Sequence, residues 1–244
     1  MKDYKGELWS NYFESCYKNV NEFTEISYKQ TAKVYHYNYG NFLPANKDAK
    51  ILDIGCGTGH FLYYLFQQGY KNFWGIDISE DQIKFIIEEA KLKPNLFGEI
   101  SKHVKLADTF EFLQYYHEWD TIVANDVLEH IEKEKILDLL NLIYRALNRD
   151  GIFIAKVPNL GNPLNVYWIY HDFTHEIGFT DVSLSQILKV AGFKEVIIAP
   201  FISPKNLVLQ KITNLARRFI FNYVFGVKTS PFLQPLIFSI GVKR

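Results

Sequence analysis

Short apolar runs alternate with longer segments of helical periodicity through most of this chain. From residue 49 onward, runs typical of buried strands lie at 50–54, 73–77, 104–108, 119–124, 152–157, 196–198 and 236–240. Segments with the periodicity of helices separate them, at 60–68, 81–91, 133–147 and 183–191. The last of these helices is expected to begin with Ser183 as its N-cap and to end at Gly192. The alternation predicts an α/β fold whose mostly parallel sheet is covered by helices on both faces.

The pattern also predicts how the chain is divided. Residues 1–47 are predicted to form an N-terminal helical cap, in which Trp9, Tyr12, Phe13 and Tyr17 make an aromatic stripe at helical spacing. We expect this stripe to pack on the main unit, 48–244, and its position is compatible with a lid over an active site. Within the main unit, 158–182 is interpreted as an acceptor loop and 203–228 as a helical insertion.

Composition narrows the range of partners. The 244 residues carry 27 basic and 27 acidic side chains, so no excess of positive charge favours nucleic acid. The N-terminus lacks the apolar run of a signal peptide, and no apolar stretch is long enough to span a bilayer. Cys56 lies inside a glycine-rich turn that a disulfide would obstruct, which favours reduced thiols. We therefore expect a soluble cytoplasmic protein, monomeric or homodimeric.

A glycine-rich loop follows the first predicted strand, in the segment Asp53-Ile54-Gly55-Cys56-Gly57-Thr58-Gly59-His60. Glycines directly after a strand let the backbone turn tightly and approach a ligand at the start of the next helix. A dinucleotide fingerprint requires a further glycine where this sequence has His60. The loop therefore suits a different ligand from NAD.

Acidic residues end the first three predicted strands, at Asp53, Asp77 and Asp108. Ligands of such sheets bind beyond the carboxyl ends of the strands, so all three carboxylates are expected at one crevice. Asp77 can accept hydrogen bonds from both hydroxyls of a ribose, and Asp108 from an exocyclic amino group such as that of adenine. Asp53 adds a negative charge that attracts a cation and repels a pyrophosphate. Each acid alone could cap a helix, but together with the glycines they favour a cationic nucleoside.

These motifs resemble the class I methyltransferases that depend on S-adenosylmethionine (SAM). The resemblance covers residues 51–59, 75–78, 107–108 and 120–130, in the order that the family shows. It implies a Rossmann-like, seven-stranded sheet whose last strand is antiparallel and lies between the fifth and sixth. It also implies SAM as cofactor and S-adenosylhomocysteine as product. The predicted cofactor site comprises Asp53, Gly55, Gly57, Gly59, Asp77, Ile78, Asp108, Thr109 and Asn125.

The residues after the fourth strand are expected to face the transferred methyl group. If a helix began directly after the fourth strand, Asp126 and His130 would lie on the same face of it. His130 is interpreted equally as a general base or as a structural residue that makes hydrogen bonds. Enzymes of this class that methylate amino groups of nucleic acids carry Asn/Asp-Pro-Pro-aromatic here. This chain has Asn125-Asp126-Val127-Leu128, which disfavours base methylation.

A second cluster, Tyr170-His171-Asp172-Phe173-Thr174-His175-Glu176, follows the fifth strand. A histidine oriented by a carboxylate could activate a hydroxyl acceptor, so His171, Asp172 and His175 join His130 as candidate catalytic residues. A hydrogen-bonded staple and a metal site with His171 and His175 on one helix are the alternatives. The acceptor site is favoured, and no metal ligand is assigned.

The segments 172–176 and 179–193 are similar to bacterial methyltransferases associated with surface polysaccharides. This resemblance implies O-methylation of a capsular or O-antigen sugar, or of a phosphate-like substituent on it. A methyltransferase of quinones or other small metabolites is the alternative enzyme. A SAM-binding partner protein without catalysis is the alternative from another class.

Residues 205–226 are amphipathic, with Val208, Ile212, Leu215, Phe219 and Tyr223 on one side of the predicted helix. We expect this stripe to pack on the sheet edge or at a dimer contact. Because the other side is basic, the helix could instead make a peripheral contact with an anionic membrane or hold a nucleotide diphosphate.

Overall fold

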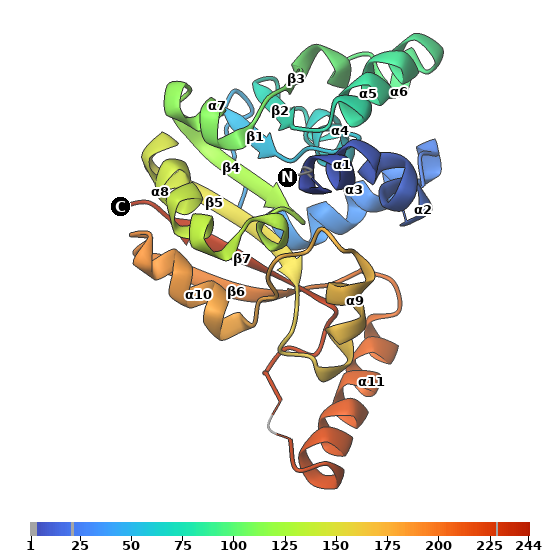
Figure 1. Cartoon of the computed structure of the whole chain (residues 1–244), viewed down its shortest axis with the longest axis vertical. Helices are drawn as coiled ribbons and strands as arrows, with labels where there is room; N and C mark the ends of the chain where they lie inside the picture. The colour runs from blue at the N-terminus through green and yellow to red at the C-terminus, as the bar shows by residue number, and fades with distance from the viewer. Residues whose placement is uncertain (1–3, 21, 228) are drawn as a thin grey trace.

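A seven-stranded sheet forms the centre of the computed structural model, which describes residues 4–20, 22–227 and 229–244 (Figure 1). The strand order is β3-β2-β1-β4-β5-β7-β6, and β7 is antiparallel to both of its neighbours. This confirms the predicted Rossmann-like sheet and the place of its last strand. The strands are β1 (Ile51–Ile54), β2 (Phe73–Asp77), β3 (Val104–Leu106), β4 (Trp119–Asn125), β5 (Leu147–Pro158), β6 (Glu195–Phe201) and β7 (Leu236–Val242).

Helices cover both faces of the sheet, and side chains alternate between the two cores. In β4, Ile122 and Ala124 belong to one apolar core while Val123 between them belongs to the other. One face carries α7 (Thr109–Tyr115), α8 (Ile136–Ala146) and α10 (Asp181–Val190). The other carries α3 (Glu25–Tyr39), α4 (His60–Gln67), α5 (Glu80–Leu92), α6 (Pro94–Phe97) and the 3-10 turn η2 (Ile100–His103).

The N-terminal helices α1 (Tyr4–Tyr12), η1 (Phe13–Tyr17) and α2 (Lys18–Val20) lie at the carboxyl ends of the strands. Phe13 is buried, with its ring 5.7 Å from that of Phe85 on α5. On α3, buried Tyr28 stacks on His60 at 3.9 Å and donates a hydrogen bond to the backbone oxygen of Thr58. The aromatic stripe therefore packs on the sheet unit, as expected.

Two predicted helix starts were wrong. The helix α10 begins at Asp181, because Thr180 is its N-cap: Thr180 Oγ1 accepts from Ser183 N, and Ser183 Oγ accepts from Thr180 N. Ser183 is thus the third residue of a capping box rather than the cap. The helix α8 begins at Ile136, and Lys133–Lys135 before it forms the 3-10 turn η4.

The loop after β5 is fastened by three asparagines. Asn159 Nδ2 donates to the carbonyls of Phe232 and Gln234, and Asn162 Nδ2 donates to that of Leu233. Asn165, in η5 (Pro163–Asn165), donates to the carbonyls of Asn159 and Pro235. The short helix α9 (Val166–His171) follows η5. These bonds tie the predicted acceptor loop to the segment that enters β7.

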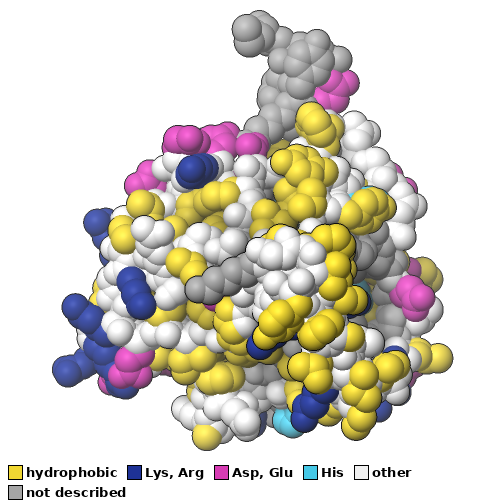
Figure 2. Space-filling model, turned by 90° about the horizontal axis from the view of Figure 1, so that it is seen from below, with side chains coloured by type: hydrophobic (Ala, Val, Ile, Leu, Met, Phe, Trp, Pro, Cys, Tyr) yellow, Lys and Arg dark blue, Asp and Glu magenta, His cyan; other side chains and the backbone are white. Residues whose placement is uncertain are grey.

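The helix α11 (Leu207–Phe219) and the π-helical turn η6 (Ile220–Val224) project from the body (Figure 1). The expected packing of the apolar stripe on the sheet edge was wrong. Ile212, Leu215 and Phe219 are 59%, 72% and 59% exposed. Half-buried Thr213 and Arg217 lie on the opposite side of the same helix. Seen from the end at which α11 projects, hydrophobic and basic side chains lie next to one another (Figure 2).

Candidate active site

A cavity of about 1330 Å³ opens at the carboxyl ends of β1, β2 and β4, beneath the N-terminal helices. Ligand pockets for one small molecule commonly measure roughly 300–1,000 Å³, so this volume has room for a cofactor and an acceptor. Every residue that the sequence assigned to the cofactor or to catalysis lines the cavity, apart from Gly59. The lining includes Asp53, Gly55, Gly57, Asp77, Ile78, Asp108, Thr109, Asn125, His130, His171, Asp172 and His175.

The glycine loop has the backbone that only glycine adopts readily. Gly55, Gly57 and Gly59 have φ of 65°, 55° and 82°. A Cβ at Gly55 would lie 2.5 Å from Val127 Cγ2, and one at Gly57 would lie 2.6 Å from the Tyr17 hydroxyl. Gly59, at the start of α4, lies behind the cavity wall and supports the loop against Ile100.

Asp77 holds the loop in place. One of its oxygens accepts from Gly57 N at 2.8 Å, and the other accepts from Ser79 N at 2.8 Å. Burial raises the pKa of Asp77, while these two N–H donors oppose that rise. Because each carboxylate oxygen has a second lone pair, Asp77 can still accept from a ligand in the cavity.

Asp53 is almost fully buried at the end of β1, and its Oδ1 meets no hydrogen-bond donor among the described residues. Burial, and then the charge of Asp77, raises its pKa well above the ordinary value. Nearby, Asn125 accepts from the Tyr39 hydroxyl at 2.9 Å, while its own Nδ2 finds no acceptor in the described part of the chain. Buried polar atoms without partners at a cavity wall are suited to bind a ligand.

Asp108 caps α7, since its Oδ1 accepts from Glu111 N at 3.0 Å. Helix capping, the alternative role considered above for each acid alone, therefore applies to Asp108. Asp108 also lines the cavity, as does Thr109. Its assignment to adenine, like the other ligand contacts, stays a prediction.

The residues after β4 do not continue as an α-helix. Asp126 has φ of 56°, and the 3-10 turn η3 (Leu128–His130) follows. The helix that would have put Asp126 and His130 on one face is therefore not formed. Instead, Asp126 pairs with Lys156, a buried cation on β5 that the sequence did not reveal.

A chain of polar contacts joins His130 to the second cluster. Thr174 Oγ1 lies 2.9 Å from His130 Nδ1 and donates to Asp172 Oδ1 at 2.6 Å. His175 Nδ1 lies 3.1 Å from the Ile169 carbonyl, and its Nε2 lies 4.0 Å from Asp172 Oδ2. The rings of His130 and His175 are 4.6 Å apart. The structure thus brings together three of the four predicted catalytic residues.

His171 stands apart from this group. It is the last residue of α9, and Asp172 after it is extended, with φ of −111° and ψ of 118°. His171 and His175 therefore cannot align on one helix, and the metal arrangement considered from their spacing was wrong. His171 is an exposed residue at the cavity rim.

Burial sets the charge states of the cluster. It lowers the pKa of His130 to about 4, with a further contribution from His175. Burial, and then the charge of Asp126, raises the pKa of Glu129 well above its usual range. For Asp172, burial acts upward, but hydrogen bonds from Thr174 outweigh it and the pKa falls. At neutral pH the cluster therefore combines a neutral His130 with an ionised Asp172.

The N-terminal helices close this side of the cavity. The rings of Trp9 and Tyr12 lie 5.4 and 5.9 Å from that of His130, and Cys16 Sγ lies 3.6 Å from Asp172 Oδ2. Burial, and then Asp172, raises the pKa of the Tyr12 hydroxyl, which stays protonated. The aromatic stripe thus packs on the sheet unit and also forms part of the cavity wall.

The profile of a protein family described as "Methyltransferase domain" matches residues 25–197. The chain belongs to the SAM-dependent methyltransferases. Carboxy-S-adenosyl-L-methionine synthase of Campylobacter jejuni is 30% identical over 177 residues, 69% of each chain. The same enzyme of Campylobacter lari is 25% identical over 75% of this chain and 76% of that protein. A match to nonribosomal peptide synthetase kk1B of Curvularia clavata, 24% identical, takes in 63% of this chain and 1% of that protein.

Solved structures show the same fold. A SAM-dependent methyltransferase from Archaeoglobus fulgidus superimposes with a TM-score of 0.63 and 22% identity, over 90% of this chain and 97% of that one. Magnesium protoporphyrin IX methyltransferase from Synechocystis PCC 6803, solved with bound SAM, gives 0.58 and 15% identity over 100% and 99%. These structures show the fold, and the family match over residues 25–197 makes the chain an enzyme with SAM as cofactor.

Proposed function

We propose that this methyltransferase transfers the methyl group of SAM to a hydroxyl of a neutral carbohydrate, such as a precursor of a bacterial surface polysaccharide. The observation that carries the proposal is the cluster of His130, Asp172 and His175 at the cavity wall. A hydroxyl is a poor nucleophile until it loses its proton, so a site for hydroxyl acceptors needs such a group.

The charge of the cavity supports a neutral acceptor. Among the described residues, its lining contains eight acidic side chains but only two lysines, Lys135 and Lys156, of which Lys156 pairs with Asp126. The raised pKa values of Asp53 and Glu129 reduce the negative charge of these two, and the others keep the lining acidic. Such a wall attracts the sulfonium of SAM and repels anions. A sugar hydroxyl therefore fits better than the phosphate-like substituent also considered. The carboxylates are Glu22, Asp53, Asp77, Asp108, Asp126, Glu129, Glu132 and Asp172.

The transfer is an in-line displacement. The acceptor oxygen forms a bond to the methyl carbon while the bond from that carbon to sulfur breaks. The electron pair returns to sulfur, which leaves S-adenosylhomocysteine without charge, and the hydroxyl proton passes to the cluster around Asp172 and His175. The wall formed by Trp9 and Tyr12 excludes water from the acceptor side, and the glycine loop positions the cofactor.

The carboxy-SAM synthases are the relatives that suggest another activity. Their name implies a carboxylated form of SAM as product, and a carboxylate-bearing ligand would meet the acidic lining described above. Methylation of a quinone or another uncharged metabolite remains the second enzyme candidate, because an aromatic wall also suits a flat apolar acceptor.

Mass spectrometry tests the proposal. The protein is incubated with SAM and separate panels of neutral glycans, nucleotide sugars, phosphorylated sugars and quinols. We expect a gain of one methylene on a glycan or on the sugar of a nucleotide sugar, together with S-adenosylhomocysteine. Methylation confined to quinols or to phosphate oxygens would overturn the carbohydrate assignment. Tight SAM binding without product in any panel would favour the partner protein without catalysis.

A further inference from the structure

Three side chains beside the acceptor end of the cavity bring possible metal ligands together, and one of them, Glu129, has no role assigned above. Glu129, His130 and His175 each offer one ligand atom, and these atoms all lie within 4.8 Å of one another. Two belong to the 3-10 turn after β4, and the third comes from the loop after α9. All three line the cavity.

The carboxylate of Glu129 provides an independent observation. The residue is 1% exposed, and its Oε2 has no hydrogen-bond partner among the described residues. An unpartnered carboxylate oxygen in such a place costs free energy unless a ligand satisfies it. The backbone around it is well ordered, because the Glu129 carbonyl accepts from the amides of Glu176 and Ile177.

Both imidazoles are oriented as metal-binding histidines usually are. His175 Nδ1 lies 3.1 Å from the Ile169 carbonyl, and His130 Nδ1 lies 2.9 Å from Thr174 Oγ1. With Nδ1 engaged in this way, the Nε2 lone pair of each ring is available. Ligating histidines typically use their other ring nitrogen on a carbonyl, carboxylate or hydroxyl, which fixes the tautomer and the ring orientation.

From this geometry we propose that Glu129, His130 and His175 bind a divalent transition-metal ion such as Zn²⁺. Two imidazoles and one carboxylate make a catalytic type of zinc site, in which a fourth position stays open. Here the open position faces the cavity. The ligand atoms must move closer together on binding, and the side-chain torsions of Glu129 and His175 provide that freedom.

This inference rests on the proposed function and specifies how the acceptor is activated. A hydroxyl bound at the open position would lose its proton more easily, because the cation stabilises the alkoxide. Asp172, whose Oδ2 lies 4.0 Å from His175 Nε2, is the nearby base that receives the proton. The oxygen then forms its bond to the methyl carbon, and the bond to sulfur breaks as before.

Cobalt provides the test, because Co²⁺ bound to nitrogen and oxygen ligands absorbs visible light. Protein freed of metals with a chelator and then exchanged into plain buffer is titrated with Co²⁺ in the presence of SAM. We expect one equivalent to bind, to produce visible absorption, and to be displaced by Zn²⁺. His175→Ala and Glu129→Gln should weaken binding by at least about tenfold, as the loss of a ligand does.

His117→Ala is the matched control. His117 is exposed before β4, at the opposite end of that strand, and its replacement should leave Co²⁺ affinity unchanged. Calorimetry with SAM on each variant shows that the fold and the cofactor site persist. No uptake by SAM-bound wild-type protein, or equal affinity in all variants, would overturn the metal site. Undiminished methylation in the presence of chelator would overturn it too, while the proposed function would stand.

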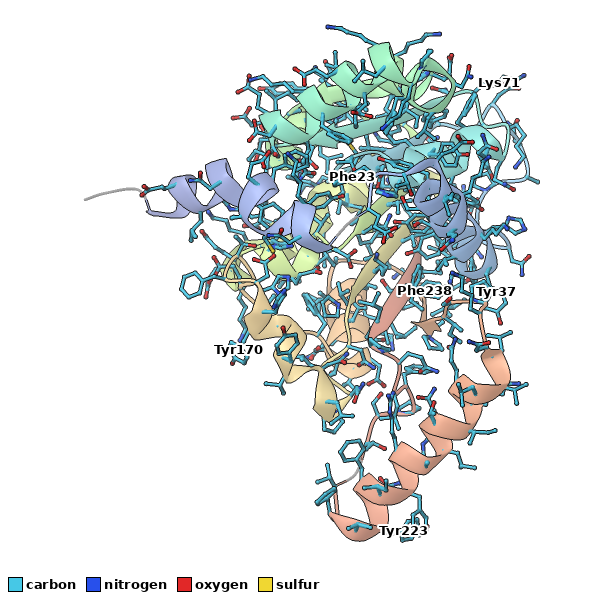
Figure 3. All side chains as sticks on the ribbon, turned by 90° about the vertical axis from the view of Figure 1, so that its right-hand side faces the viewer. Phe23, Tyr37, Lys71, Tyr170, Tyr223 and Phe238 are labelled. Carbon is cyan, nitrogen blue, oxygen red and sulfur yellow. The ribbon has the colours of Figure 1, made fainter. Side chains whose placement is uncertain are left out.

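A second inference comes from a separate feature, the projecting helix formed by α11 and η6. Its 13 and 5 residues form one continuous helical segment. The outward stripe is apolar, with Val208, Leu215, Phe219 and Tyr223 exposed by 72%, 72%, 59% and 78%. Figure 3 places Tyr223 at the far end of this projection, remote from Phe238 in the sheet.

The charge beside this stripe points to an anionic surface. Lys211 and Arg218 are exposed on α11 and Lys205 is exposed just before it, and no acidic residue occurs between 205 and 227. An apolar face bordered by basic side chains is the pattern of helices that lie in the interface of a bilayer. Among the described residues, no helix is long and apolar enough to cross a bilayer.

We infer that α11 and η6 dock on an anionic lipid bilayer. A smaller hollow of about 230 Å³ lies between the start of this helix and the main cavity. It is lined by Ser203 and Lys205, just before α11, and shares Gln30, Tyr35 and Lys156 with the main cavity. Docking would therefore hold this side of the main cavity near the membrane, which suits an acceptor carried on a lipid.

Vesicle sedimentation tests the second inference. The protein is mixed with vesicles of phosphatidylcholine alone or with phosphatidylglycerol added. We expect binding only to the anionic vesicles, weakened by salt and reduced by at least about tenfold in Phe219→Glu, because a buried aromatic ring is lost. Leu92→Glu, at an exposed apolar position on α5, is the control and should bind like wild type.

Sedimentation velocity tests the alternative, in which a second copy of this chain covers the apolar stripe. If the wild-type protein is a dimer that Phe219→Glu converts to a monomer, and it ignores anionic vesicles, the apolar stripe is a contact between copies. That result, or equal binding to both kinds of vesicle, would overturn the membrane inference.

Discussion

The two ends of the cavity are built in different ways. At the cofactor end, β1 and β2 each deliver an acid, and the glycine loop between β1 and α4 lies close along the chain. At the acceptor end, η1, η3 and residues 172–177 come from distant parts of the sequence and are joined by hydrogen bonds such as Glu176 N to the Glu129 carbonyl. Local spacing therefore encodes the cofactor end, whereas the acceptor end exists only after the chain has folded. Substitutions should separate the two.

The largest effect is expected at the glycine loop. Gly55→Ala introduces a Cβ 2.5 Å from Val127 Cγ2 at a residue with φ of 65°. A left-handed alanine costs about 1–2 kcal/mol, and the overlap adds to this, so we expect about 3 kcal/mol less stability and the loss of SAM binding. Urea unfolding and calorimetry measure both.

Gly69→Ala is the matched control, because its φ of 78° is similar but no atom lies within 4 Å of the added Cβ. Its free energy of unfolding should fall only by the cost of a left-handed alanine, and its SAM affinity should be unchanged. Equal losses in the two variants would show that contact with Val127 is unimportant.

The next largest effect is expected for Asp77→Asn. The amide keeps the shape but replaces one acceptor of the Gly57 and Ser79 amides by a donor. Charge-assisted hydrogen bonds contribute about 1.5–3 kcal/mol each, so SAM affinity should fall by about tenfold to a hundredfold. If the SAM affinity measured by calorimetry stays within twofold of wild type, Asp77 does not contribute to SAM binding.

Asn165→Ala addresses the acceptor end alone. It removes the hydrogen bonds that Asn165 Nδ2 donates to the carbonyls of Asn159 and Pro235, and the one that Asn165 Oδ1 accepts from Asn162 Nδ2. Both carbonyls keep one backbone donor. The three lost hydrogen bonds should cost about 2 kcal/mol and loosen the loop that carries His175. We expect slower methyl transfer with unchanged SAM affinity. Reduced SAM affinity with normal turnover would contradict the separation of the two ends.

The smallest effect concerns pH and His60, which stacks on Tyr28. Burial lowers the pKa of His60 from 6.5 to about 4, so the unfolded chain binds a proton that the folded chain does not. Stability is therefore complete above pH 6.5 and falls as the pH drops towards 4. Between pH 7.5 and 5.5 this amounts to about 1 kcal/mol. Urea unfolding at both pH values measures this. The stability that His60→Gln loses between pH 7.5 and 5.5 should be smaller than the wild-type loss by about 1 kcal/mol.

The sequence was sufficient for the sheet, the glycine loop and the acids because each depends on spacing within one or two elements. The place of β7 came from the family resemblance. The spacing of Asp126 and His130 left open whether a helix begins directly after β4, and the left-handed backbone of Asp126, which spacing does not reveal, prevents one. Lys156 could not be assigned from the sequence, since its role depends on Asp126, the residue that follows the neighbouring strand β4.

Glu129 lies within the motif at residues 120–130, but its importance depends on burial that no local pattern reveals. The outward stripe of α11 was wrongly expected to be packed, because periodicity shows that a helix is two-sided but not which side faces the body. Thr174 shows the same limit: its contacts with His130 and Asp172 depend on a loop path that only the folded chain defines.

The position of β7 has a consequence for synthesis on the ribosome. β6 pairs only with β7, and β7 also holds the far edge of β5, so β6 has no place in the sheet until residues 236–242 have emerged. The asparagine ties of the loop after β5 also wait for residues 232–235. The strands from β1 to β5 can assemble earlier, as the nascent chain lengthens. Removal of the last nine residues should therefore leave β6 exposed and prone to aggregate, with the acceptor end unformed.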